Sequence, residues 1–425
     1  MGSGIGRHPG RLRPPPQRPP GVLTLRILWV ANYSPAPPDS GGKIRVFHMV
    51  RAALAAGHTI DFWAVDSQPA TWPAPLPPGL TFQYLPARLR RSPAEKLMTF
   101  VAALPETCWS VRSEPVLRAL AGVASGQYDL AVLDQHCYAL HPELEALGLP
   151  FVANVHNVES DVVRQMGVGG RRLRTRVHLA VDARKYERME ATALPRAASV
   201  VVVSDLDRER LAGLAAARRW KVHPNGVDLA YFDFVDHAEA RGAEFLMTAT
   251  FGYTPNVDAA LWLGETVWPA IRQALPDARV RLVGRDVTRE VQALHRPEVG
   301  FEVVGRVPDV RPYMAAADVF VVPLRMGGGT RLKVLEALAS GIPVLGTALA
   351  VEGLGVEDGE AVAVASTPAQ FAAAAATLLA DTARRHRMAR LGRDLVERHF
   401  GWDAIGRDFQ ATLAEAVEAI PSAHR

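Results

Sequence analysis

Glycines, cations and one acid come together in residues 327–336 of the chain, which read GGGTRLKVLE. Backbone N–H groups of glycines at a helix start can bind an anion, and the helix N-terminus adds positive potential. Arg331 and Lys333 would lie in the first turn of that helix, where the macrodipole disfavours cations unless an anion joins them. A nucleoside diphosphate would be such an anion, and Glu336 could then accept hydrogen bonds from two ribose hydroxyls.

The same helix, expected to begin near Thr330, also allows a structural interpretation. Lys333 and Glu336 stand three residues apart, which predicts that they share one exposed face as a surface ion pair. The opposite face carries the apolar stripe expected of a helix packed on a core: Leu332, Leu335, Leu338 and Ala339. The two interpretations differ in whether the charges face a ligand or solvent.

A second glycine-rich segment, residues 39–43, follows the first apolar run of the chain and reads DSGGK. Gly41 and Gly42 would let backbone N–H groups approach an anion at a helix start, and Lys43 could add a point charge. The alternative is an ordinary helix start with Ser40 as its N-cap.

The elements that must position these loops alternate along the first half of the chain. Amphipathic stretches, for example Ile44–Ala56 and Arg174–Ala193, predict helices between short apolar runs. Strands apolar throughout and separated by helices are typical of parallel βαβ units with both sheet faces covered. The predicted strands are Arg26–Ala31, Thr59–Val65, Thr81–Leu85, Asp129–Leu133, Pro150–Val155 and Ser199–Ser204.

Turn formers at residues 222–228 interrupt this pattern, which then restarts and ends in helical periodicity from about residue 368 to 420. The predicted strands are Glu244–Ala249, Arg279–Val283, Phe301–Val304, Val319–Val322, Val344–Gly346 and Ala361–Val364. Open parallel sheets bind ligands outside the carboxyl ends of their strands. Two such domains facing each other would therefore place the carboxyl edges of both sheets on one cleft. We therefore divide the chain into an arm (1–21), two domains (22–223 and 224–398) and a terminal helix returning to the first domain (399–425).

Composition excludes several classes of protein. Of 425 residues, 48% are hydrophobic and 22% charged, which argues against wholesale disorder and small disulfide scaffolds. The net charge of +4 matches the four arginines of residues 1–20, which hold no acid, so the remainder is balanced and a nucleic-acid partner is not indicated. Cys108 and Cys137 form no ligand cluster and no apolar stretch is long enough to span a membrane, which favours a cytoplasmic location.

Three motifs together resemble the group 1 (family 4) glycosyltransferases: GGGTRLKVLEALASGIPVLGT from Gly327, PPDSGGKIRVFHMVR from Pro37 and HPNGVD from His223. The resemblance implies a GT-B fold, α/β with two Rossmann-like domains facing each other across a cleft. It implies a nucleotide-sugar donor held by the C-terminal domain and a carbohydrate or lipid-linked acceptor held by the N-terminal domain. Retention of anomeric configuration is implied as well, with no cofactor and no obligatory metal, in polysaccharide or glycoconjugate biosynthesis.

The resemblance also implies roles for individual residues. His156 corresponds to the family's histidine near the transferred sugar, and Glu336 to its ribose-binding glutamate. With Arg331 and Lys333 these are the catalytic candidates. The donor-binding candidates are Gly41, Gly42, Val307, Gly327, Gly328, Gly329 and Thr330.

The chain departs from the family pattern at two places. Many relatives carry a glutamate eight positions before the one matched by Glu336, where this chain has Gly328. Many also carry a basic pair after the first strand of the second domain, where residues 251–254 read FGYT. We therefore assign the charge that faces the diphosphate to Arg331 and Lys333.

Three further signals receive a structural interpretation or stay open. Asp205 and Asp207 form a DxD, which we interpret as acids in the first turn of a capped helix and not as metal ligands. Residues 88–101 combine cations with an apolar helix face, which allows either a solvated loop or peripheral contact with the inner face of a membrane. Glu159 is a weaker candidate on the acceptor side.

Other activities stay open at this point. A different GT-B enzyme, such as a nucleotide-sugar epimerase or hydrolase, or a non-catalytic nucleotide-sugar-binding protein would share these motifs. A dehydrogenase is disfavoured because no GxGxxG follows a predicted strand.

Overall fold

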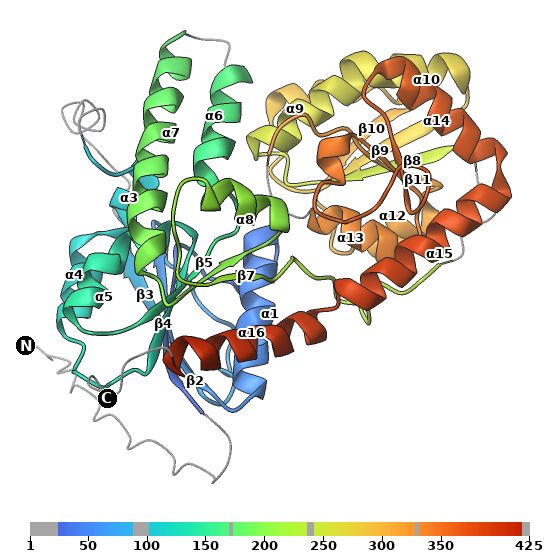
Figure 1. Ribbon diagram of the computed structural model, residues 1–425. Helices are drawn as coiled ribbons and strands as arrows, with labels where there is room; N and C mark the ends of the chain where they lie inside the picture. Colours follow the sequence, from blue (N-terminus) through green and yellow to red (C-terminus); the bar gives the residue numbers. More distant parts are fainter. Residues whose placement is uncertain (1–23, 88–101, 170–172, 236–241, 328–330, 419–425) are drawn as a thin grey trace, which may run out of the picture.

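The computed structural model describes residues 24–87, 102–169, 173–235, 242–327 and 331–418, which form two α/β domains side by side (Figure 1). In the first domain, successive strand residues point to opposite faces of the sheet, as the pleat requires. Leu28 belongs to the hydrophobic core on one face and Trp29 to the core on the other. Both faces are therefore covered.

The first sheet has seven parallel strands in the order β3-β2-β1-β4-β5-β6-β7. Its strands are β1 (Arg26–Ala31), β2 (Thr59–Asp66), β3 (Leu80–Pro86), β4 (Leu130–Asp134), β5 (Phe151–Asn154), β6 (Ser199–Val202) and β7 (Trp220–Val222). The α-helices of this domain are α1 (Gly41–Ala55), α3 (Glu106–Val111), α4 (Glu114–Ala121), α5 (His141–Ala146), α6 (Glu159–Gly169), α7 (Leu173–Ala193) and α8 (Asp205–Ala212).

The second sheet has six parallel strands in the order β10-β9-β8-β11-β12-β13. Its strands are β8 (Glu244–Thr248), β9 (Arg279–Val283), β10 (Phe301–Gly305), β11 (Val319–Val322), β12 (Val344–Gly346) and β13 (Val362–Val364). The α-helices that follow β8 are α9 (Thr254–Trp262), α10 (Trp268–Ala274), α11 (Arg289–Gln292), α12 (Arg311–Ala316), α13 (Leu332–Ala339), α14 (Pro368–Ala380), α15 (Thr382–His399) and α16 (Trp402–Glu418).

Both sheets share one topology, in which the chain builds outward to one edge and then returns to the middle to build the other edge. The return occurs between β1 and β4 in the first sheet and between β8 and β11 in the second. Side chains that follow these central strands therefore flank a crevice at the carboxyl edge, the usual ligand position in such sheets.

All twelve predicted strands are present, with ends that differ by at most two residues. The prediction missed β7, whose three residues are all half-buried and so carry no apolar run. Helix α1 begins at Gly41, three residues before the predicted start, so both glycines are part of the helix. Ser40 occupies the N-cap position in extended backbone, but its side chain makes no capping hydrogen bond.

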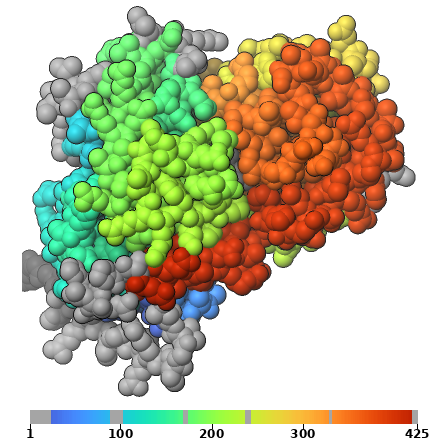
Figure 2. Space-filling view, in the orientation of Figure 1, coloured from blue at the N-terminus to red at the C-terminus, as the bar shows by residue number. Residues whose placement is uncertain are grey.

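The last two helices cross from the second domain to the first (Figures 1 and 2). Helix α16 packs on α1, where the Trp402 ring stacks on His48 with centroids 4.8 Å apart and planes at 3°. Residues 222–228 form the hinge between the two domains. Gly226 in this hinge makes room for Trp402, because a Cβ there would lie 2.7 Å from Trp402 Cδ2. Phe409 of α16 belongs to a core of the first domain.

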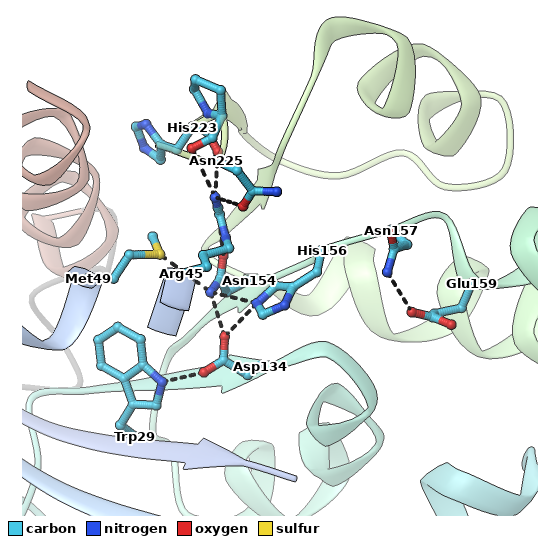
Figure 3. Close-up of polar contacts among 11 residues, drawn as sticks. Trp29, Arg45, Met49, Asp134, Asn154, His156, Asn157, Glu159, His223 and Asn225 are labelled. Atoms are coloured by element: carbon cyan, nitrogen blue, oxygen red, sulfur yellow. Dashed lines mark hydrogen bonds and ion pairs between the residues drawn. The ribbon is translucent and has the colours of Figure 1, made fainter. Parts of the chain in front are cut away.

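A buried guanidinium joins α1, β5 and the hinge (Figure 3). Arg45 is 1% exposed; its Nη2 donates to Asn154 Oδ1 at 3.0 Å, and its Nη1 donates to the carbonyls of His223 at 2.8 Å and Pro224 at 3.1 Å. Burial lowers the pKa of Arg45 to about 10, so the side chain stays charged at neutral pH. The hinge is thus fixed to the sheet edge of the first domain.

Replacement of Arg45 tests this connection. Arg45→Met is expected to lower the free energy of unfolding by about 3 kcal/mol, because buried carbonyl and amide oxygens lose a charged donor. Arg51→Met, on the exposed face of the same helix, should change it by less than about 0.5 kcal/mol. Denaturant unfolding of both variants measures the difference, and equal midpoints would remove Arg45 from its structural role.

Candidate functional site

A cleft of about 890 Å³ lies between the two domains, where the carboxyl edges of both sheets face each other. The first domain lines it with the segment after β1, the start of α1 and the segment from β5 into α6. The second domain lines it with the loops after β8, β9 and β10 and with the start of α13. Both crevices predicted by the sheet topology therefore open into one space.

The structure brings residues far apart in the sequence together in this cleft. Of the catalytic and donor-binding candidates, the cleft is lined by Gly41, Gly42, His156, Val307, Arg331, Lys333 and Glu336. The Gly327 N–H donates to Gln165 Oε1 of α6 at 2.8 Å, so this glycine contacts the opposite domain. Gly328, Gly329 and Thr330 lie outside the described residues.

Helix α13 begins at Leu332, with Arg331 in the N-cap position. Val334, Leu335, Ala337 and Leu338 are all buried, so most of the circumference of the helix is packed. The prediction that Lys333 and Glu336 share a solvent-exposed face is therefore wrong. They share a face, but it forms a wall of the cleft.

Lys333 donates to a side chain of α9 (Lys333 Nζ to Asn256 Oδ1, 2.7 Å), and no ion pair joins it to Glu336 in the described part of the chain. Asn256 Nδ2 donates in turn to the Thr250 carbonyl at 3.0 Å, which fixes the orientation of the amide. Helix α9, which follows the segment that lacks the basic pair of many relatives, thus contributes an amide that orients Lys333. Asn256 was not identified from the sequence, because nothing in the residues around it indicates this role.

Burial shifts the protonation of both charged groups on this wall. Desolvation lowers the pKa of Lys333 to about 7, helped by the nearby charge of Arg331. Desolvation also raises the pKa of Glu336 to about 7. A bound anion would favour the charged lysine, and hydroxyl donors would favour the charged glutamate.

A buried carboxylate at the end of β4 organises the opposite wall (Figure 3). Asp134 is fully buried and accepts hydrogen bonds from Trp29 Nε1 and from Asn154 Nδ2, the latter at 2.5 Å. His156 Nε2 lies 3.1 Å from Asp134 Oδ1. Nε2 also lies 3.2 Å from Asn154 Nδ2. We assign the proton to Nε2 because the nearby carboxylate oxygen is a hydrogen-bond acceptor, which leaves Nδ1 as the acceptor of the neutral ring.

His156 Nδ1 is the atom of this ring available to a ligand. It is buried and makes no hydrogen bond with any described residue, and burial lowers the pKa of the ring. A Cβ added to Gly42 would lie 3.5 Å from this atom and 2.9 Å from the Tyr33 hydroxyl. A side chain at Gly42 would therefore clash with the Tyr33 hydroxyl beside Nδ1.

Two acids lie near each other close to the start of α6: Glu159 of α6 and Glu190 of α7. Glu159 lines the cleft, and burial raises its pKa to about 7. Asn157 Nδ2 donates weakly to it at 3.4 Å. The next residue, Ser160, donates to Glu190 of α7 at 2.6 Å, so Glu190 supports the helix start and Glu159 is left facing the cleft.

The DxD of Asp205 and Asp207 lies outside the cleft. Ser204 caps α8, its Oγ accepting from the Asp207 N–H, so the DxD lies in a helix start as predicted. Among the described residues, no group of three histidines, cysteines or acids could hold a metal ion. No helix in the described ranges is long and apolar enough to cross a membrane. Residues 88–101, the proposed membrane contact, lie outside those ranges.

Two family profiles match the sequence, one for each domain. The profile described as Glycosyltransferase Family 4 matches residues 40–231, and the profile described as Glycosyl transferases group 1 matches residues 243–381. A comparison with curated proteins found no match.

Solved structures share the architecture over nearly the whole chain. Sucrose-phosphate synthase from Thermosynechococcus elongatus is 22% identical and aligns with a TM-score of 0.72, covering 93% of this chain and 100% of that one. Anabaena HepE, solved in complex with UDP and glucose, is 16% identical with a TM-score of 0.65, covering 92% and 99%. A glycosyltransferase from Rickettsia africae is 12% identical with a TM-score of 0.64, covering 93% and 99%. The shared feature is the GT-B fold.

Proposed function

The chain belongs to the group 1 (family 4) glycosyltransferases, and from that premise we propose that it transfers a sugar, with retention of anomeric configuration, from a nucleoside-diphosphate sugar. The N-terminal domain binds the acceptor, a carbohydrate or a lipid-linked one, and the C-terminal domain binds the donor. The reaction needs no metal ion and serves polysaccharide or glycoconjugate biosynthesis.

The observation that carries this proposal is the set of charged groups at the start of α13. Arg331 and Lys333 are both desolvated beside a helix N-terminus, an arrangement that an anionic ligand stabilises. When the glycosidic bond to the donor breaks, negative charge grows on the departing diphosphate. Fixed cations and backbone N–H groups in a site shielded from water stabilise that charge.

Glu336 and Val307 account for the rest of the nucleotide in this proposal. Glu336 lies one helical turn beyond Lys333 on the same wall, within the reach of a ribose attached to the diphosphate. Val307 lines the cleft in the loop after β10 and offers an apolar surface to the base. The donor thus lies along the carboxyl edge of the second sheet.

His156 faces the sugar from the first domain. Its Nδ1 accepts a hydrogen bond from a sugar hydroxyl in the space beside Gly42, while Asp134 holds the ring. The acceptor hydroxyl attacks on the face from which the diphosphate departs, and the departing phosphate takes the proton. This route retains configuration without a protein nucleophile, and Glu159 on the same wall is available to bind the acceptor.

Nucleotide-dependent thermal stability tests the proposal. We expect one of UDP, GDP, ADP and CDP to raise the melting temperature equally with and without EDTA. A ligand at a hundred times its Kd adds about 2.7 kcal/mol, or several degrees at roughly 2–4 °C per kcal/mol. A shift with NAD alone would contradict the transferase, and a shift abolished by EDTA would contradict metal independence.

The affinity for that diphosphate is expected to be greatest near pH 7. Bound phosphate raises the pKa of Lys333 from about 7, so binding weakens as pH rises above this value. Ribose hydroxyls lower the pKa of Glu336 from about 7, so binding also weakens as pH falls below it. The affinity falls by up to about tenfold per pH unit both above pH 7, in the alkaline limb, and below it, in the acid limb.

Calorimetric titration between pH 5.5 and 9 measures both limbs. Lys333→Met should flatten the alkaline limb and Glu336→Gln should reduce the acid limb, since each removes one titrating group. An alkaline limb that persists in Lys333→Met would exclude this lysine as its source.

A further inference from the structure

An ion pair crosses the cleft between the two domains. Arg285 Nη1 lies 2.9 Å from Asp39 Oδ2, and these residues are 246 positions apart. Lys43 Nζ lies 3.1 Å from the other oxygen, Asp39 Oδ1. The Asp39 carboxylate therefore pairs with a cation from each domain. A phosphate group with two free oxygens can pair with two cations in the same way.

Arg285 follows β9, next to the loop after β8 that contains no cation of its own. The two loops are joined because the Phe251 N–H donates to the Arg285 carbonyl at 2.8 Å. Gly252 brings them into contact, since a Cβ there would lie 3.1 Å from Asp286 Cβ. Arg285 thus carries a positive charge beside the loop whose sequence position holds the basic pair in many relatives.

Asp39 occupies the other side of the same space. It precedes Gly41 and Gly42, the first residues of α1, and both Asp39 and Arg285 line the cleft. A negative group at this point opposes the binding of a diphosphate unless its cations are shared with the ligand. A ligand anion at this position would therefore have to compete with the Asp39 carboxylate for its cations.

We propose that Arg285 is a phosphate-binding residue of the donor site, which Asp39 holds across the cleft in the nucleotide-free protein and which a bound diphosphate takes over. This assignment rests on the proposed function and adds a third cation to Arg331 and Lys333. The exchange preserves charge balance, because the arginine passes from one anion to another.

A second cross-domain ion pair provides a matched control. Arg210 Nη2 of α8 lies 3.1 Å from Glu352 Oε1 of the second domain, and neither residue lines the cleft. Its side chains are 29% and 24% exposed, against 26% and 28% for Arg285 and Asp39. Breaking this pair loosens the same domain contact without removing a cleft-lining side chain, and it reaches the donor site only through the charge that Glu352 and Arg210 exert on Arg331.

Calorimetric titration with the diphosphate identified by thermal stability, and with its parent nucleoside, tests the assignment. Arg285→Met should weaken diphosphate binding by about tenfold or more, as for loss of a charge-assisted hydrogen bond, and leave nucleoside binding unchanged. Arg285→Lys should keep most of the affinity, and melting of the free variants checks that each is folded. Glu352→Gln should change diphosphate binding less than Asp39→Asn does, because it removes only a longer-range charge near Arg331.

A double-mutant cycle tests the competition. Asp39→Asn should tighten diphosphate binding about threefold, the range of a partly exposed ion pair, and most of this gain should vanish in the Arg285→Met background. Wild-type affinity in Arg285→Met, or equal losses for diphosphate and nucleoside, would overturn the assignment while the proposed function stands. Tightening by Glu352→Gln equal to that by Asp39→Asn, or a gain that persists without Arg285, would also overturn it. A wild type that binds none of the diphosphates would overturn both proposals.

Discussion

The buried guanidinium of Arg45 is the interaction on which the arrangement of the cleft depends. It joins α1 to Asn154 of β5 and to two carbonyls of the hinge, so the helix start that carries Gly41 and Gly42 is fixed relative to both. Asn154 also donates to Asp134, which orients His156. One charged group, retained inside the protein because its donors are satisfied, thereby links the segment between the domains to the His156 ring that lines the cleft.

The cations that the second domain places in the cleft differ in their counter-charge. Lys333 contacts an amide and not a carboxylate, and burial lowers its pKa. Arg285 has a carboxylate partner in Asp39. Lys333 would therefore gain from an incoming anion directly, whereas Arg285 would have to exchange one anion for another. This difference explains how a single ligand could both bind strongly and change the contact between the domains.

Much of the fold could be predicted because its signals are local. Apolar strands and glycine-marked helix starts depend on neighbouring residues, so both ends of β1 were predicted correctly and the start of α13 was predicted within two residues. The network around Asp134 could not be predicted, since its members come from β1, β4 and β5 and meet only after the sheet forms. Lys333 and Glu336 were correctly placed on one face, but only the packing of α13 on both sides shows that this face borders the cleft.

Turnover of a nucleotide sugar by the wild type and by Lys333→Ala measures the central claim most directly. The sugar donor is chosen by the diphosphate that stabilises the protein, and release of that diphosphate is followed at saturating donor concentration. If α13 stabilises the departing phosphate, kcat should fall by about two orders of magnitude or more, while Lys221→Ala, outside the cleft, should keep the wild-type rate. Near wild-type turnover in Lys333→Ala would contradict the account.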